Sequence, residues 1–166
     1  MPSVKISKQN NTGIYFLTMT INRWYYIFDR HNRWDILAKS LQYCQKNKGV
    51  KIYGFVFMLN HIHLIVQSAD VSGFVRDFKR FTSSELHKNL QKTEPSVLEL
   101  FMVDDKYQFW QKTNMPKLIE TVNFFENKLE YIHNNPVRKN YVLEPKYWYW
   151  SSANSLCELK VDDVES

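Results

Sequence analysis

Hydrophobic and polar positions along the 166-residue chain first predict β-strands. The run 14–20 is rich in β-branched and aromatic residues and follows a turn signal. Two further runs of this kind, 51–58 and 61–67, are separated by only two residues. We expect a tight antiparallel hairpin there, or else one long bent strand.

Three segments have the periodicity of amphipathic helices. Apolar residues recur at three- and four-residue steps in 32–47, and Gly49 follows as a stop signal. The segment 71–90 has phenylalanines on one side and cationic residues on the other. The clearest stripe lies in 118–135 and predicts a helix that ends before Pro136. Its members are Leu118, Val122, Phe125, Leu129 and Ile132.

The remaining segments have weaker patterns. Residues 91–103 are polar and poorly periodic, which indicates a loop, and 107–110 suits a short strand. The acidic end, 161–166, is expected to be loose. Closely spaced strands together with helices predict one α+β domain over 1–166, with its core at about 13–153. Its expected architecture is a ferredoxin-like sandwich, an antiparallel sheet with helices packed on one face.

Charge and cysteine content indicate which partners and which cellular compartment suit the protein. The net charge of +5 suits a polyanionic partner but does not require one. Cys44 and Cys157 form no CxxC pattern, and the first residues lack the apolar stretch of a signal peptide. No run reaches the roughly 18 apolar residues of a membrane span. We therefore expect a protein of a reducing compartment that does not associate with membranes.

The sequence His61-Ile62-His63 lies in the third predicted strand. Residues two apart in a strand point to the same face, so the two imidazoles project together while Ile62 projects toward a core. Two neutral imidazoles side by side can begin a divalent metal site. The pattern is weak alone, because this composition gives such a triplet by chance about one time in seven. On this motif alone, two surface histidines on a sheet are the favoured interpretation.

Tyr131 and Asn135 are four residues apart on the third predicted helix and therefore share a face. A tyrosine oxygen can attack phosphorus and form a covalent intermediate. The asparagine carbonyl oxygen is a hard ligand suited to Mg²⁺ or Mn²⁺. On local grounds alone, an interfacial tyrosine and a helix-ending asparagine before proline are the simpler interpretation.

Together these features resemble the single-tyrosine HUH transposases of insertion sequences, and most closely their REP-associated tyrosine transposase relatives. The HUH motif, His-hydrophobic-His, is present as His61-Ile62-His63, and the second signature, Tyr-Ile-x-x-Asn-Pro-Val, is present at 131–137. Further matches occur in the order that the family shows, which is far more specific than any single motif. They are Gly13-Ile14-Tyr15 with Thr18, the run 53–60, Phe109-Trp110-Gln111, and Tyr149-Trp150-Ser151-Ser152.

This resemblance implies a role for each signature residue. His61 and His63 would bind a divalent metal, Mg²⁺ or Mn²⁺, with Asn135 as the third ligand. Tyr131 would be the nucleophile. The implied reaction is the cleavage and transfer of single-stranded DNA at hairpin-containing element ends, through a 5′-phosphotyrosine. Such a protein would act in the bacterial cytoplasm, on the nucleoid when bound to DNA.

Two positions depart from the family's usual pattern. Leu59 stands where the family usually has proline, and Asn140 stands where it usually has glycine. Asparagine is the next-best residue for a left-handed backbone, so the second change is mild. Neither departure affects the four signature positions, and the sequence gives no sign of an inactive enzyme.

Cationic residues are the candidates for contacts with DNA phosphates. Arg76, Lys79 and Arg80 share the basic side of the second predicted helix, and Arg138 and Lys139 follow the tyrosine signature. Each is equally well explained as an ordinary solvated cation. The resemblance also leaves open whether the third helix completes the site of its own chain or that of a partner in a homodimer.

Three other functions are alternatives. A domesticated relative would hold hairpin DNA or RNA without performing chemistry, although the intact signature residues speak against it. A relaxase or replication initiator is generally larger or has a second tyrosine close by. A metal-dependent hydrolase of unrelated fold would need carboxylates near the histidines.

Overall fold

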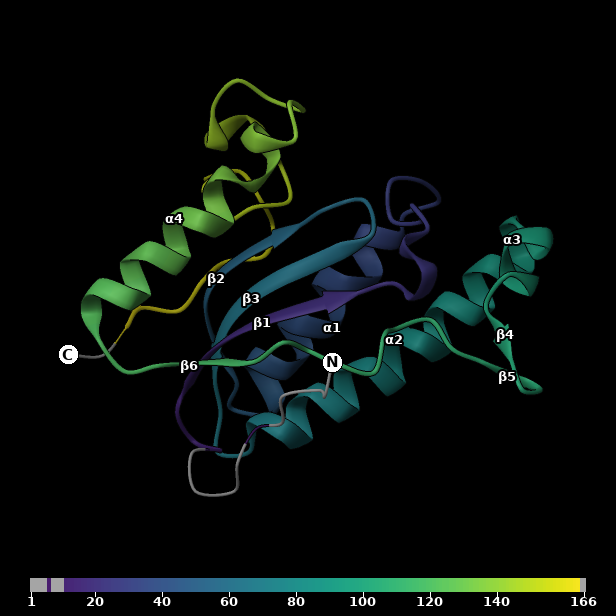
Figure 1. The fold of residues 1–166 in the computed structure, drawn as a ribbon, viewed down its shortest axis with the longest axis horizontal. Helices are drawn as coiled ribbons and strands as arrows, with labels where there is room; N and C mark the ends of the chain where they lie inside the picture. The colour runs from purple at the N-terminus through teal and green to yellow at the C-terminus, as the bar shows by residue number, and fades with distance from the viewer. Residues whose placement is uncertain (1–5, 7–10, 165–166) are drawn as a thin grey trace.

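The computed structural model describes residue 6 and residues 11–164. Within them, four antiparallel strands form one sheet in the order β2-β3-β1-β6 (Figure 1). The strands are β1 (Ile14–Thr20), β2 (Lys51–Phe57), β3 (His61–Gln67) and β6 (Lys117–Ile119). The Met58 N–H donates to the His61 carbonyl at 2.8 Å and closes the turn between β2 and β3. The predicted hairpin is confirmed, and one long bent strand is excluded.

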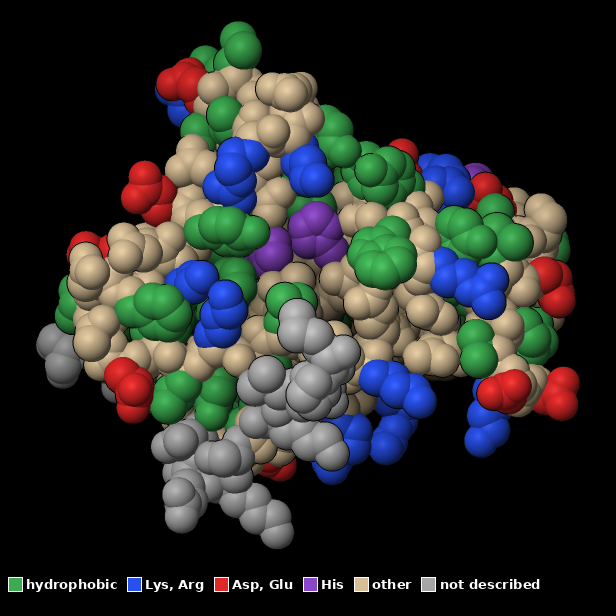
Figure 2. Space-filling view, viewed as in Figure 1, with side chains coloured by type: hydrophobic (Ala, Val, Ile, Leu, Met, Phe, Trp, Pro, Cys, Tyr) green, Lys and Arg blue, Asp and Glu red, His purple; other side chains and the backbone are tan. Residues whose placement is uncertain are grey.

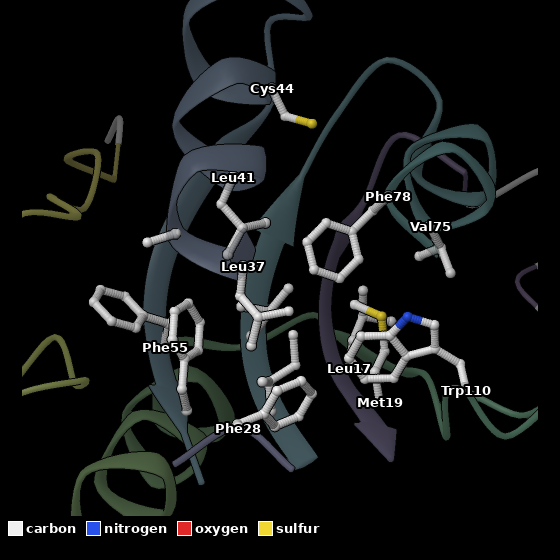
Figure 3. Packing of buried hydrophobic residues seen from close by; sticks show 14 of the residues in the cluster. Leu17, Met19, Phe28, Leu37, Leu41, Cys44, Phe55, Val75, Phe78 and Trp110 are labelled. Carbon is white, nitrogen blue, oxygen red and sulfur yellow. The ribbon is translucent and has the colours of Figure 1, made fainter. Parts of the chain in front are cut away.

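Two long helices cover one face of this sheet. α1 (Arg33–Asn47) connects β1 to β2, and α2 (Val71–Thr93) follows β3. This strand order with these connections is that of a ferredoxin-like sandwich, so the predicted α+β class is confirmed. Figure 3 shows Leu37 and Leu41 of α1 and Phe78 of α2 among the strand side chains in the main hydrophobic core.

The last helix, α4 (Val122–Arg138), lies on the opposite face of the sheet (Figure 1). Its Ile132 is fully buried with Phe16, Val56 and Ile65 in a second, smaller core. The prediction that the helices pack on one face is therefore wrong for this helix. Alternate strand residues point to opposite faces, and because both sets are apolar here, both faces need a cover.

The start of α4 differs from the prediction. Thr121 caps the helix, and its side chain accepts a hydrogen bond from the Phe124 N–H at 3.1 Å. Leu118 consequently belongs to β6, which we did not predict. The strand was hidden because Leu118 is spaced four residues before Val122 and extends the helical stripe by coincidence. Val122 itself is 75% exposed, and packing of α4 against the second core begins at Phe124 and Phe125.

The end of α4 also lies later than predicted. Pro136 is inside the helix, which ends at Arg138. The Lys139 N–H still donates to the Asn135 carbonyl at 3.1 Å, so one more helical turn forms beyond the proline. Asn140 then adopts a φ of 62°, a left-handed conformation that asparagine tolerates better than most residues. Asparagine thus takes over here the backbone role expected of glycine.

The connection between α2 and β6 contains more structure than predicted. It forms a short helix, α3 (Pro95–Glu99), and a hairpin of β4 (Met102–Val103) and β5 (Lys106–Tyr107). Phe109 and Trp110 follow as buried core residues and not as part of a strand. Two 3-10 turns complete the elements: η2 (Asn22–Trp24) and η3 (Pro145–Tyr147). Among the described residues, no helix combines the length and apolar character needed to cross a bilayer.

The chain after α4 covers the outer edge of β2. The Ser152 N–H donates to the Phe55 carbonyl at 3.0 Å, and the Asp162 N–H donates to the Ile52 carbonyl at 2.7 Å. The prediction of a loose acidic end is therefore wrong up to Asp162, because these backbone bonds satisfy an otherwise open strand edge. Residues 165–166, which that prediction also included, lie outside the described part of the chain.

Candidate active site

The two histidines lie side by side on β3, on the face that α4 covers. Their ring centroids are 4.9 Å apart. The His63 ring is stacked on Phe16 of β1 at 5.3 Å, and His63 is only 5% exposed. In the register of the sheet, Thr18 pairs with His63 and Thr20 with His61. The shared face that the strand periodicity predicts is thus present, but it is a partly buried face and not an open surface.

Hydrogen bonds hold both imidazoles through the same ring atom. The Nδ1 atom of His61 is 2.8 Å from Oδ1 of Asn60, and Nδ1 of His63 is 2.9 Å from Oγ1 of Thr18. When Nδ1 donates in each of these contacts, the lone pair of each ring is on Nε2. Such outer hydrogen bonds are what typically orient metal-binding histidines.

Burial keeps both imidazoles neutral. Desolvation lowers the pKa of His61 to about 4, and the positive charge of Lys139 adds to the effect. Desolvation also lowers the pKa of His63 to about 3, with the cations Arg138 and Lys128 acting in the same direction. At neutral pH both rings are therefore in the unprotonated form that a metal ion requires.

Tyr131 of α4 faces this histidine pair. Its ring centroid lies 5.5 Å from that of His63, at an interplanar angle of 73°. The guanidinium of Arg138 lies over the Tyr131 ring, 4.2 Å from its centroid, and also donates to the Tyr131 carbonyl at 3.1 Å. Tyr131 is 43% exposed, and its hydroxyl makes no hydrogen bond to a described residue. Ring contacts thus hold the phenol while its oxygen stays available.

Asn135 lies one turn further along α4 and is the most unusual polar residue of the site. It is only 4% exposed, yet its side-chain amide has no hydrogen-bond partner among the described residues. The amide is not sealed from solvent, since Oδ1 of Asn114 is the fully buried side-chain polar atom that lacks a partner in the described part of the chain. The Asn135 side chain borders a cavity, where a bound group can supply the missing interaction.

All four signature residues line one open cavity of about 530 Å³, which we call the α4 cavity. Figure 2 shows histidine side chains near the centre of this face, with lysine and arginine side chains around them. All four residues belong to one chain, so here α4 lies over the histidines of its own chain. The α4 cavity is lined by Thr18, Thr20, Trp24, Asn60, His61, His63, Tyr131, Asn135, Arg138 and Lys139.

The donor atoms of the cavity define which ligands it can hold. No aspartate or glutamate is among its lining residues. The described part of the chain also contains no group of three or more His, Cys, Asp or Glu residues placed to hold a metal. The uncharged donor groups of the cavity are therefore imidazoles, side-chain amides and hydroxyls.

The predicted DNA-contacting cations fall into two groups. Arg138 and Lys139 line the α4 cavity. Arg76, Lys79 and Arg80 lie on α2, which packs on the other face of the sheet, and do not line the cavity. The Lys79 side chain also already has a hydrogen-bond partner within the protein. Its ammonium donates to the Gln111 carbonyl at 2.9 Å, and burial lowers its pKa to about 8. Contacts between these α2 residues and DNA stay a prediction.

Several cavity residues were missed by the sequence interpretation. Asn60 was not among the predicted site residues, although it directly precedes the histidine motif and bonds to His61. Trp24 gave no signal, because only the fold brings its 3-10 turn to the histidines. His133, by contrast, does not line the cavity, and its Nε2 lies 2.7 Å from Oγ of Ser152. That contact fastens α4 to the segment on the edge of β2.

Comparisons with known proteins agree with this geometry. The family described as "Transposase IS200 like" matches residues 9–135, a stretch that contains all four signature residues. A solved structure described as a REP-associated tyrosine transposase bound to a REP hairpin has a similar fold, with a TM-score of 0.70 and 17% sequence identity. That similarity covers 100% of this chain and 94% of the other. No curated protein sequence matches the chain.

Proposed function

The chain belongs to the IS200-like transposases, and from this premise we propose that it cuts and rejoins single-stranded DNA with Tyr131 as the nucleophile. The observation that carries the proposal is the position of Tyr131, whose ring lies 5.5 Å from that of His63 in a shared cavity. A free tyrosine hydroxyl beside two neutral imidazoles is the arrangement that metal-assisted attack on a phosphodiester needs.

The donor set of the cavity fits a divalent metal. His61 and His63 are neutral with Nε2 available, and the buried Asn135 amide lacks a partner among the described residues. We propose that these three residues hold Mg²⁺ or Mn²⁺. When bound, the ion would polarise the scissile phosphate and stabilise the charge that develops there. Three protein ligands also leave coordination positions for the phosphate.

The covalent step transfers a phosphoryl link from DNA to protein. The Tyr131 oxygen attacks phosphorus, and the bond between phosphorus and the 3′ oxygen breaks. The proton lost by the phenol balances the proton gained by that 3′ oxygen. The products are a 5′-phosphotyrosine and a free 3′-hydroxyl. Attack by the 3′-hydroxyl of another strand reverses the step and joins the two DNAs. Because one ester replaces another, no nucleotide cofactor is needed.

Arg138 has two roles in this proposal. Its guanidinium lies on the Tyr131 ring and bonds to the backbone of the same residue, which restricts the direction of the phenol. Its positive charge, with that of Lys139, also lies at the cavity where a phosphate would bind. We infer that both cations contact the DNA backbone beside the scissile bond.

The substrate is proposed to be a single strand that carries a hairpin. The cavity is open to solvent and has imidazole, amide and cationic groups, which suit an exposed phosphodiester more than a small apolar molecule. The protein of similar fold was solved with a hairpin, which supports a hairpin as the recognised element.

A covalent-adduct assay tests this function. The protein is incubated with Mn²⁺ and a labelled single-stranded hairpin oligonucleotide taken from the repeats that flank its own gene, then run on a denaturing gel. Wild type should give a DNA–protein band, and Tyr131→Phe should reduce it by at least about 1,000-fold. Tyr43→Phe is the matched control, because Tyr43 is 58% exposed and lies on α1, on the other face.

Two outcomes would contradict the proposal. Hairpin binding without any adduct from wild type would favour the non-catalytic binding protein. An undiminished adduct from Tyr131→Phe would move the chemistry to another residue. Adduct formation that chelation abolishes and Mn²⁺ restores would support the metal.

A further inference from the structure

Trp24 is an exposed aromatic side chain at the rim of the α4 cavity. It is 67% exposed, and its ring makes no aromatic or hydrogen-bond contact with the described residues. The other four tryptophans are buried or half-buried and contact aromatic rings. Because the ring is uncovered and lines the same cavity as the proposed catalytic residues, its face is available to a ligand bound there.

The backbone presents this ring in a strained conformation. Arg23 and Trp24 have φ angles of 61° and 57°. Residues with a Cβ avoid this left-handed region, which costs roughly 1–2 kcal/mol per residue. Two such residues in succession persist only where surrounding contacts hold them in place.

One side chain connects the Trp24 turn to the histidine pair. The Asn60 amide nitrogen donates to the Trp24 carbonyl at 3.0 Å, while its Oδ1 lies 2.8 Å from Nδ1 of His61. The Trp24 N–H also donates to the Ile21 carbonyl at 3.0 Å. Asn60 therefore fixes the position of the turn relative to His61.

We propose that Trp24 is a stacking platform for an unpaired nucleobase next to the scissile phosphate. This inference rests on the proposed single-stranded DNA substrate. A nucleotide has a charged phosphate and a flat apolar base, and the α4 cavity offers groups for both: Arg138 and Lys139 for the phosphate, and the indole face for the base. A base inside a duplex has both faces covered by its neighbours, so the platform selects single strands at the cutting position.

Equilibrium binding tests the platform independently of the chemistry. Fluorescence anisotropy is measured in the Tyr131→Phe background without metal, with the labelled hairpin oligonucleotide used for the adduct assay. Adding Trp24→Ala should weaken binding by roughly 10- to 100-fold, whereas Trp24→Phe should keep most of the affinity. Tyr43→Ala, an exposed aromatic on the other face, should have no effect. Thermal melting of each variant checks that the fold is unchanged.

Abasic substitution then locates the base. Oligonucleotides that each lack one base near the cutting position are bound to the same proteins. With Trp24 present, removing one particular base should weaken binding about as much as Trp24→Ala does, and in the Trp24→Ala protein the same removal should cost nothing further. Additive losses, or no sensitive position, would overturn the platform.

The two proposals can fail separately. If wild type forms the adduct but neither Trp24→Ala nor any abasic site weakens binding, the platform is wrong and the reaction stands. If binding depends on Trp24 and on one base but no adduct forms, the platform stands and the catalytic function is wrong.

Discussion

The two faces of the sheet differ in how completely their side chains are packed. On the α1–α2 face, Leu37, Phe55 and Phe78 are among many side chains with 0–1% exposure, and the polar groups there largely have partners. On the α4 face the core is small, and beside it lie the half-exposed Tyr131 and the unpartnered Asn135 amide. The α1–α2 face is closely packed within the protein, whereas the α4 face retains polar groups that have no partner among the described residues.

This difference explains how the fold can carry a reactive site at little cost to stability. The strands are shared, so the residues of β3 that point to the α1–α2 core fix the backbone from which the histidines project. Substitutions on the α1–α2 face should therefore mainly lower stability, whereas substitutions on the α4 face should mainly lower activity.

The largest stability effect is expected at Phe78. Phe78→Ala removes a buried ring that contacts Phe74 and Trp110, and it should lower the free energy of unfolding by about 3–5 kcal/mol. Tyr131→Phe, whose hydroxyl has no partner among the described residues, should change it by less than about 0.5 kcal/mol. Urea denaturation of both variants measures the contrast. Similar losses from the two would erase the distinction between the faces.

A smaller effect is expected from mild acid. The pKa values of about 4 for His61 and about 3 for His63 lie below that of imidazole in an unfolded chain, near 6.5. Below pH 6.5 the unfolded chain therefore binds protons that the folded chain does not, and stability falls with falling pH. We expect a loss of about 3 kcal/mol between pH 6.5 and pH 5 in metal-free protein, about half of it from each histidine.

The double variant His61→Asn with His63→Asn is the control for the acid effect. It should show a much flatter dependence in urea denaturation over the same pH interval. An equally steep fall in this variant would assign the acid sensitivity to other groups and would contradict the neutral state of the pair.

A small stability effect is also expected at Asn135. Asn135→Ala should cost less than about 1 kcal/mol, because its amide forms no hydrogen bond with a described residue. The same variant should weaken Mn²⁺ binding at least about tenfold in isothermal titration if the amide oxygen is a ligand. Asn134→Ala is the matched control, since Asn134 bonds to the Glu130 carbonyl on the same helix. Unchanged Mn²⁺ affinity in Asn135→Ala would remove this residue from the metal set.

Local patterns were sufficient to predict the central strands. They were also sufficient to predict that each pair of signature residues shares one face of its element. The run 14–20 and the run 61–67 match β1 and β3, because alternation within a single strand is a local property. The histidine pair and the Tyr131–Asn135 pair each share a face for the same reason. That the two pairs lie together in one cavity was predicted from the family resemblance. Neither the strand periodicity nor the helix periodicity predicts it.

The missed features depend on contacts between distant segments. β6 has only three residues, and Leu118 within it also fits the apolar stripe of the following helix. The sequence pattern therefore did not reveal its pairing with β1. The side of the sheet taken by α4 depends on both strand faces being apolar. Trp24 reaches the cavity through a turn held by Asn60, 36 positions later in the chain. None of these follows from local periodicity.

The identity of the nucleophile is tested most directly by mass spectrometry of the covalent adduct. Wild-type protein is reacted with the hairpin oligonucleotide and Mn²⁺, digested with protease and nuclease, and searched for a peptide that carries a nucleotide phosphate. The modification is expected on Tyr131 alone among the ten tyrosines of the chain. A phosphodiester on any other residue, such as the exposed Tyr26 or Tyr141, would contradict the account.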